Sequence, residues 1–186
     1  MNAWDYLDVD TPLGPMRLAA MGGAGPASLG GAWFLDQKDL PPAGPQWRRD
    51  PASSVLARAA GELADWFGGR LRRFSVPLAP QGTEFQRAVW QALVEIEFGD
   101  TISYGELSRR IGRPRAVRAV AGAVGRNPIS IFIPCHRIVG SDSALTGFGG
   151  GLPRKRALLL HEGRRYDRAD RRAREASGDL FEGLDG

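Results

Sequence analysis

Residues 127–140 read NPISIFIPCHRIVG, in which an apolar run from Ile129 to Ile133 leads through a proline to a cysteine, a histidine and an arginine. A thiol with the ordinary pKa of ~8.5 is mostly protonated at neutral pH, and a nearby imidazole, arginine or helix N-terminus can lower that pKa. We therefore predict that Cys135 is a nucleophile rather than an inert buried thiol, with His136 and Arg137 as the groups that lower its pKa.

Neighbours in sequence need not touch in space, so His136 could instead act on the thiol through one bridging water. A carboxylate would then fix the tautomer of the imidazole, as in a nucleophilic triad. The spacing offers Glu106, Asp142 and Glu162 for that role and selects none of them.

The charge distribution indicates a phosphate-binding face. Residues 81–163 hold 11 basic and 7 acidic side chains, whereas residues 1–80 and 164–186 are each balanced, so the middle block carries the whole net charge of +4. Within residues 103–140 only Glu106 opposes seven arginines, a pattern expected of a surface that binds nucleic acid. These arginines are Arg109, Arg110, Arg113, Arg115, Arg118, Arg126 and Arg137.

Residues 83–125 predict three helices. Apolar residues recur every three or four positions from Phe85 to Ile96, after a capping box at Thr83 and Gln86. A second capping box at Ser103 and Glu106 opens a helix that Gly112 ends.

The third helix covers 115–124 after a turn of about four residues, which is typical of a helix-turn-helix. Its small residues Ala119, Ala121, Gly122 and Ala123 would allow close approach to a partner. Two packed helices of any mixed domain would give the same pattern, and the arginine surplus favours DNA.

The N-terminal part predicts a small antiparallel sheet with one covering helix. Residues 4–9, 16–21 and 32–35 have strand patterns, 40–51 is a proline-rich loop, and apolar residues at helical spacing span 55–67. We expect RRFSVPLAP, residues 72–80, to form an extended strand or a connector. The fold class is thus α+β, with a mostly helical C-terminal domain that contains the helix-turn-helix. We expect domains at 1–79 and 80–163 and a charged extension at 164–186.

Several classes of site and location are excluded by composition. One cysteine forms no internal disulfide, and with two histidines it cannot build a four-ligand zinc site, so we expect no metal. GGGLPRK at 149–155 lacks the glycine before lysine of a phosphate-binding loop. No stretch approaches the ~20 apolar residues of a membrane helix, and the acidic start is no secretory signal. We expect a cytoplasmic monomer.

The run PCHRIVG, the preceding Asn127-Pro128, the upstream helix pair and the downstream GG…K…LLLHEG together resemble the O6-alkylguanine-DNA alkyltransferase family. The resemblance covers residues 80–163. Residues 1–79 are similar more loosely, through TPLGPMRLAA, which implies a ribonuclease-H-like N-terminal domain, and 164–186 fall outside it.

The resemblance implies irreversible transfer of an alkyl group from O6 of guanine in double-stranded DNA, or less readily from O4 of thymine, to Cys135. It implies that His136 activates the thiol through water, that Glu162 orients His136, and that Asn127 joins the recognition helix to the active-site loop. No cofactor is implied. Arg137 is expected to anchor the loop, and His161 to be structural.

The resemblance also assigns the residues that meet DNA. Tyr104 and Arg118 would rotate the target nucleotide out of the duplex and fill its place, because a base must leave the stack before a side chain can reach it. Arg115 and Val139 are further expected contacts. Phe148 stands where many relatives have a tyrosine that can bond the departing oxygen, and the backbone N–H of Gly149 could replace that donor.

Two other classes of function stay open. A lesion sensor would evert the base without reacting, although the presence of Cys135 disfavours it. A cysteine hydrolase would turn over an acyl substrate many times. The alkyltransferase would react once, because the chain has no second cysteine to resolve the thioether.

Overall fold

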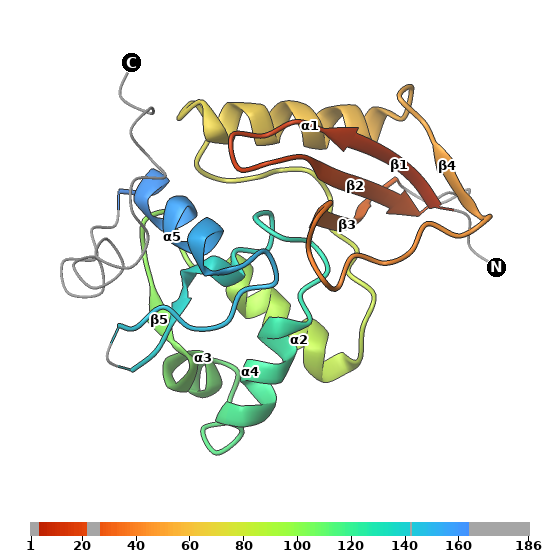
Figure 1. Ribbon diagram of the computed structural model, residues 1–186. Coiled ribbons are helices and arrows are strands. Elements are labelled where there is room, and N and C mark those ends of the chain that lie inside the picture. The colour runs from red at the N-terminus through yellow and green to blue at the C-terminus, as the bar shows by residue number, and fades with distance from the viewer. Residues whose placement is uncertain (1–3, 22–26, 142, 164–186) are drawn as a thin grey trace.

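The computed structural model describes residues 4–21, 27–141 and 143–163, and the expected extension at 164–186 lies outside them. The N-terminal part is a four-stranded sheet in the order β3-β2-β1-β4 (Figure 1). Antiparallel pairing joins β1 to β2 and β2 to β3. The strands are β1 (Trp4–Val9), β2 (Met16–Met21), β3 (Leu29–Phe34) and β4 (Trp47–Arg49).

The structure corrects two details of the predicted sheet. Strand β3 begins at Leu29 instead of residue 32, and β4 lies within the segment expected to be a loop. Because β4 runs parallel to β1, the sheet is mixed rather than antiparallel. Trp47 stacks on Trp4 with ring centroids 5.5 Å apart. This long-range contact stabilises β4, which is too short for its sequence to show the alternation of apolar and polar residues typical of a strand.

One helix covers the sheet as expected (Figure 1). Helix α1 (Ser54–Phe67) buries its apolar stripe against the strands. Gly68 caps its end, and Gly69 follows with φ +70°. The buried residues of the stripe are Val55, Leu56, Ala59, Leu63 and Trp66.

Four helices build the C-terminal part: α2 (Glu84–Val94), α3 (Tyr104–Arg110), α4 (Val117–Gly125) and α5 (Leu152–His161). The short strands β5 (Ile102–Ser103) and β6 (Ile138–Val139) pair in parallel, and a single 3-10 turn, η1, covers Cys135–Arg137. The indole of Trp90 on α2 donates to the Ala123 carbonyl of α4 at 2.9 Å, which ties these two helices together.

Local capping chemistry explains where these helices begin. The capping box of Thr83 and Gln86 is present with both of its hydrogen bonds. The second predicted box is only half formed, because Ser103 accepts from the Glu106 N–H while the Glu106 carboxylate pairs with Arg109 and Arg110. Helix α4 starts two residues later than expected, so residues 111–116 make a longer turn than predicted.

The two parts share one continuous core. Strand β3 forms backbone bridges with the connector at Leu78 and with the cysteine-containing segment at Ile129. Ala32 N donates to the Pro128 carbonyl at 2.9 Å, and Ser130 N donates to the Ala32 carbonyl at the same distance. The sheet therefore supports the segment that leads to Cys135. The domain boundary expected between residues 79 and 80 stays a prediction.

Across the described residues, no helix combines the length and the apolar character that crossing a membrane requires. The same residues contain no group of three His, Cys, Asp or Glu side chains placed to hold a metal ion.

Candidate active site

Asn127 fixes the turn that presents the cysteine. Its Oδ1 accepts from the Ile129 N–H at 3.0 Å, and its Nδ2 donates both to the Ile133 carbonyl at 2.8 Å and to Cys135 Sγ at 3.1 Å. Ile131 lies between these contacts with φ +73°, a conformation that costs a β-branched residue about 1–3 kcal/mol. The surrounding hydrogen bonds must therefore hold the turn in place.

Cys135 opens the 3-10 turn η1 directly after Pro134, and only 6% of its surface is exposed. Burial raises the pKa of the thiol above its ordinary value, and the Asn127 amide and the charge of Lys155 oppose this only in part. The expected lowering of the thiol pKa by His136 or Arg137 is not met on balance, because burial outweighs the hydrogen bond from the His136 backbone N–H. A thiol enclosed by apolar neighbours loses the water that would stabilise its anion, so the resting sulfur is protonated at neutral pH.

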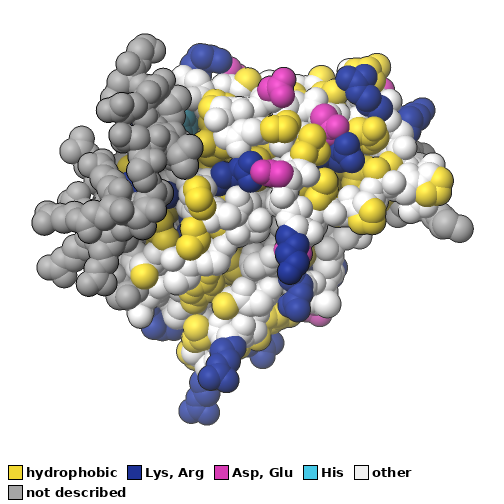
Figure 2. All heavy atoms as spheres, viewed as in Figure 1, with side chains coloured by type: hydrophobic (Ala, Val, Ile, Leu, Met, Phe, Trp, Pro, Cys, Tyr) yellow, Lys and Arg dark blue, Asp and Glu magenta, His cyan; other side chains and the backbone are white. Residues whose placement is uncertain are grey.

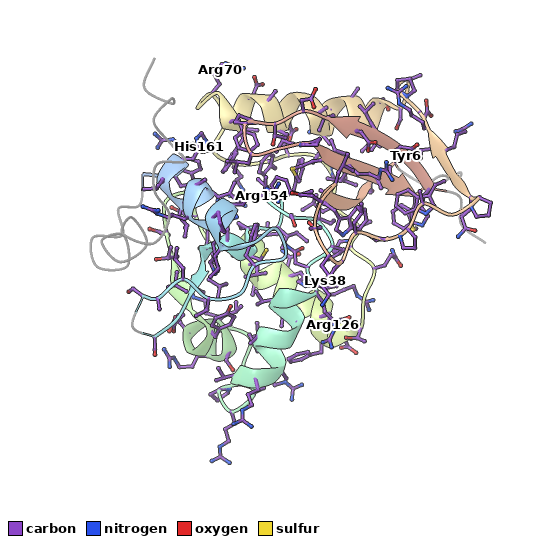
Figure 3. All side chains as sticks on the ribbon, in the orientation of Figure 1. Tyr6, Lys38, Arg70, Arg126, Arg154 and His161 are labelled. Carbon is purple, nitrogen blue, oxygen red and sulfur yellow. The ribbon has the colours of Figure 1, made fainter. Side chains whose placement is uncertain are left out.

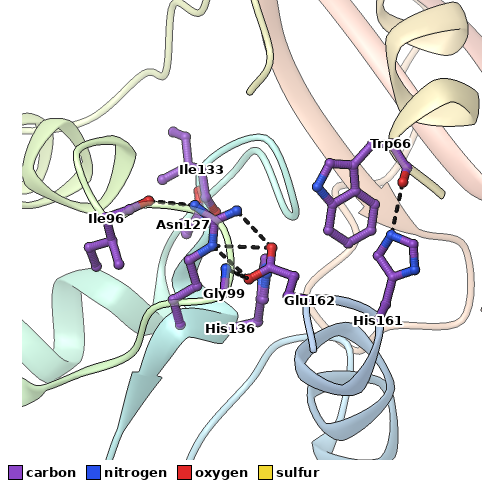
Figure 4. A network of polar contacts seen from close by, with 9 residues as sticks. Trp66, Ile96, Gly99, Asn127, Ile133, His136, His161 and Glu162 are labelled. Atoms are coloured by element: carbon purple, nitrogen blue, oxygen red, sulfur yellow. Dashed lines mark hydrogen bonds and ion pairs between the residues drawn. The ribbon is translucent and has the colours of Figure 1, made fainter. Parts of the chain in front are cut away.

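His136 is fully buried, and its Nε2 lies 3.1 Å from Glu162 Oε1 (Figure 4). Since an ionised carboxylate only accepts hydrogen bonds, Nε2 carries the proton and Nδ1 of the neutral ring keeps a lone pair. Nδ1 has no hydrogen-bond partner among the described residues. Burial lowers the pKa of His136, so the ring is neutral at pH 7 and able to take up a proton.

Glu162 is held by more than the histidine. Arg137 donates to both of its oxygens, with Nε 2.9 Å from Oε2 and Nη2 2.7 Å from Oε1, and the Gly99 N–H donates at 3.2 Å. Arg137 also donates to the Ile96 carbonyl, which joins the group to the end of α2. Hydrogen bonds from His136 and Arg137 outweigh burial and lower the pKa of Glu162 to about 2. Arg137 thus anchors the loop, as expected.

Lys155 is a buried cation that the sequence did not assign to the site. Its Nζ donates to the carbonyls of Ile138, Thr146 and Gly147, so it ties the strand after the cysteine to the loop that follows. Burial lowers its pKa to about 8. Its place on the apolar face of α5, three and four residues before the buried Leu158 and Leu159, is the signal that could have revealed it.

The loop segment 146–150 lies between this lysine and Tyr104. The Tyr104 hydroxyl reaches the Thr146 carbonyl at 3.5 Å, a long contact. Phe148 is half-buried against the core, Gly149 is exposed, and Val139 is buried in β6.

Comparison with known proteins identifies the group to which these residues belong. A model described as the DNA binding domain of 6-O-methylguanine DNA methyltransferase matches residues 84–164. The methylated-DNA–protein-cysteine methyltransferase of Mycobacterium tuberculosis is 44% identical over 154 residues, which covers 83% of this chain and 89% of that protein. The chain belongs to the methylated-DNA–protein-cysteine methyltransferase family.

Another member of the methyltransferase family, from Haemophilus influenzae, is 54% identical over 119 residues, covering 63% of this chain and 66% of that protein. The crystal structure of Mycobacterium tuberculosis OGT in complex with DNA superposes with a TM-score of 0.75 at 43% identity, covering 85% of this chain and 92% of that one. The α+β fold is therefore that of a solved methyltransferase.

The arginines expected to meet DNA lie apart from the buried group. Arg118 on α4 and Arg115 in the preceding turn are exposed, and neither has an acidic partner within the described ranges. Arg113 and Arg126 are likewise exposed. Figure 2 shows Lys and Arg side chains at the lower tip of the molecule, where Figure 1 has the turn between α3 and α4. Arg113 and Arg115 belong to this turn, whereas Figure 3 places Arg126 away from the tip.

The structure therefore brings together Cys135, Asn127, His136 and Glu162, and adds Arg137 and Lys155. Two surface cavities, of about 620 and 310 Å³, lie along the connector and α2, and Cys135 lines neither of them. His161 is structural, as expected, because its Nε2 lies 2.8 Å from the Trp66 carbonyl of α1.

Proposed function

We propose that the chain repairs double-stranded DNA by moving an alkyl group from O6 of guanine, and less readily from O4 of thymine, to Cys135 Sγ. The observation that carries the proposal is the part-buried Asn127–Cys135 hydrogen bond next to the buried His136–Glu162 pair, in a member of the methyltransferase family. In the reaction a sulfur–carbon bond forms as the carbon–oxygen bond breaks, so the thiol must give up its proton and the departing guanine must gain one.

The proton path follows from the protonation states. The resting thiol is protonated and the imidazole is neutral, so one water between Sγ and His136 Nδ1 would carry the proton to the ring. Buried nitrogen atoms normally find a partner, and Nδ1 lacks one in the described protein. Glu162, ionised at neutral pH, would stabilise the imidazolium that forms, and Arg137 keeps this carboxylate in place.

The departing guanine oxygen needs a donor of its own. Phe148 has no hydroxyl to offer, whereas the N–H of the exposed Gly149 stands next to it in the same loop. A backbone N–H aimed at developing negative charge is a common form of transition-state stabilisation. We therefore assign this donor role to Gly149, and the buried Val139 and the ring of Phe148 to the apolar wall of the base site.

DNA would be bound by α3 and α4 acting as a helix-turn-helix. Arg113, Arg115, Arg118 and Arg126 are free to meet phosphates, which gives binding without base specificity. The exposed Ala119 and half-exposed Gly122 allow close backbone approach, which suits the minor groove, whereas Ala123 is buried in the core. Tyr104 and Arg118 would evert the target nucleotide and replace it in the stack.

Mass spectrometry of the intact chain tests the reaction. After incubation with duplex DNA that contains O6-methylguanine, each chain should gain one methyl group and no more, without any added cofactor or metal. Steady release of product from a limiting amount of protein would contradict the proposal, since a thioether has no displaceable group and the chain has one cysteine.

Arg118→Ala tests nucleotide eversion. We expect the transfer rate from duplex DNA to fall about tenfold, because filling the vacated stack offsets part of an unstacking cost of a few kcal/mol. Transfer from the free O6-alkylguanine base should stay unchanged. The matched control is Arg110→Ala, which removes a nearby arginine already paired with Glu106. An equal loss with duplex and free base would contradict the assigned role.

A further inference from the structure

Arg154 on α5 joins the N-terminal part to the loop beside the active site. Its Nε donates to the Leu13 carbonyl at 2.8 Å, its Nη1 to the Gly150 carbonyl at 3.2 Å, and its Nη2 to Asp36 Oδ2 at 2.9 Å. Figure 3 shows Arg154 between α5 and the N-terminal sheet. One side chain therefore fixes three backbone or side-chain oxygens from three separate segments.

The packing around the guanidinium is tight. Its carbon lies 4.2 Å from the centre of the Phe34 ring on β3. A Cβ built at Gly150 would lie 2.9 Å from that ring and 2.7 Å from the ring of Phe148, so the loop backbone rests on both rings without space for a side chain. Gly149 is exposed, and a Cβ added there would meet Gln37 Nε2 at 3.5 Å, an ordinary van der Waals distance. The N-terminal part therefore packs directly against residues 148–150.

Adjacent residues of α5 hold the two ends of this loop segment. Lys155 binds the carbonyls of Thr146 and Gly147, and Arg154 binds that of Gly150. Neighbouring side chains on a helix point about 100° apart, so one reaches the core while the other reaches the N-terminal part. The segment that holds Phe148 and Gly149 is fixed from both sides.

We propose that Arg154 is a positioning residue, which uses the N-terminal part to set where Phe148 and Gly149 meet the alkylated base. The inference rests on the proposed function of that loop. An arginine suits the role because the donors of its planar guanidinium point in fixed directions, whereas the three donors of a lysine ammonium rotate. The ion pair with Asp36 contributes little, since the Asp36 side chain is 66% exposed.

The test uses Arg154→Ala and Arg154→Met, of which the second keeps an unbranched stem over Phe34 and loses all three hydrogen bonds. Single-turnover transfer is measured at saturating lesion duplex and with free O6-alkylguanine base, and the end-point of each reaction gives the active fraction. We expect the rate per active molecule to fall about tenfold with both substrates, because small displacements of a positioned group slow reactions strongly. The duplex concentration for half-maximal rate should not change.

Two control variants separate positioning from general stability. Arg17→Ala removes an arginine with similar contacts, a bidentate pair with Asp8 and a ring contact with Tyr6, that stays within the β1–β2 hairpin. Asp36→Asn removes only the exposed charge. Both should transfer within about twofold of the wild-type rate.

The inference would be overturned by unchanged rates in both Arg154 variants, by a loss confined to duplex DNA, or by an equal loss in Arg17→Ala. If the wild-type chain transferred no alkyl group to begin with, the proposed function itself would be wrong, and the inference would fall with it.

Discussion

Cys135→Ala should abolish alkyl transfer completely while the chain still binds lesion-containing duplex. The chain has one cysteine, and in the proposed mechanism His136 accepts the proton of its thiol. The cationic surface of α3, α4 and their turn does not involve this atom, so affinity for DNA should be retained. Intact mass after long incubation measures transfer, and fluorescence anisotropy with labelled duplex measures binding.

Ser130→Ala is the matched control, since Ser130 is equally buried in the same segment. It should take up one alkyl group as the wild type does. Label on the Cys135→Ala variant would refute Cys135 as the acceptor. An unlabelled wild-type chain that binds the lesion tightly would instead favour a lesion sensor, and repeated release of an acyl product would favour a hydrolase.

In the proposed mechanism, the raised pKa of the thiol makes the reaction depend on His136 as well as on Cys135. A sulfur that is ionised at rest would react with many electrophiles, whereas a protonated sulfur attacks only where its proton can leave. In the mechanism that we propose, proton transfer to His136 and arrival of the alkylated base would therefore occur in one assembled site. Cys135 as the nucleophile stays a prediction from the sequence. The raised pKa of its thiol was not predictable there, because burial depends on segments far apart in the chain.

The helices were predictable wherever short-range chemistry decides them. Thr83 and Gln86 cap α2 from three residues apart, and the apolar stripe of α1 follows from its spacing alone. Strand β4 was not predictable, because Trp47 is ordered by Trp4 and by pairing with β1. The spacing along α5 could have shown that Lys155 is buried, but not which groups it binds, because these are carbonyls of two other segments.

The candidate residues of the site were also predictable only in part from the local sequence. Cys135 and His136 stood out through their neighbours in the sequence, whereas the resemblance in motifs selected Glu162 and Asn127. The structure shows two hydrogen-bonded pairs among the four residues, Asn127 with Cys135 and His136 with Glu162. Spacing alone left Glu106, Asp142 and Glu162 as candidate partners of the histidine. The geometry decides between the two described candidates, since Glu106 pairs with Arg109 and Arg110 on the exposed side of α3.

Glu162→Gln should both slow transfer and destabilise the fold. Glutamine keeps the size of the side chain but leaves Arg137 buried without its counter-ion, which costs about 3–5 kcal/mol of unfolding free energy. It also removes the charge that stabilises the imidazolium of His136, so we expect transfer to slow about a hundredfold. Urea unfolding and single-turnover rates per active molecule measure the two effects.

The pH dependence of stability isolates the carboxylate. The pKa of Glu162 lies at about 2 in the fold against an ordinary 4.5, so its ionised form contributes about 3 kcal/mol above pH 4.5, and this contribution is lost as the pH falls toward 2. The difference in unfolding free energy between wild type and Glu162→Gln should therefore shrink over that range. Glu62→Gln is the control, because Glu62 on α1 accepts hydrogen bonds from Ser75, Val76 and Arg58 away from the thiol. If Glu62→Gln slowed transfer as much, or Glu162→Gln transferred at the wild-type rate, the carboxylate would have no specific part in activating the thiol.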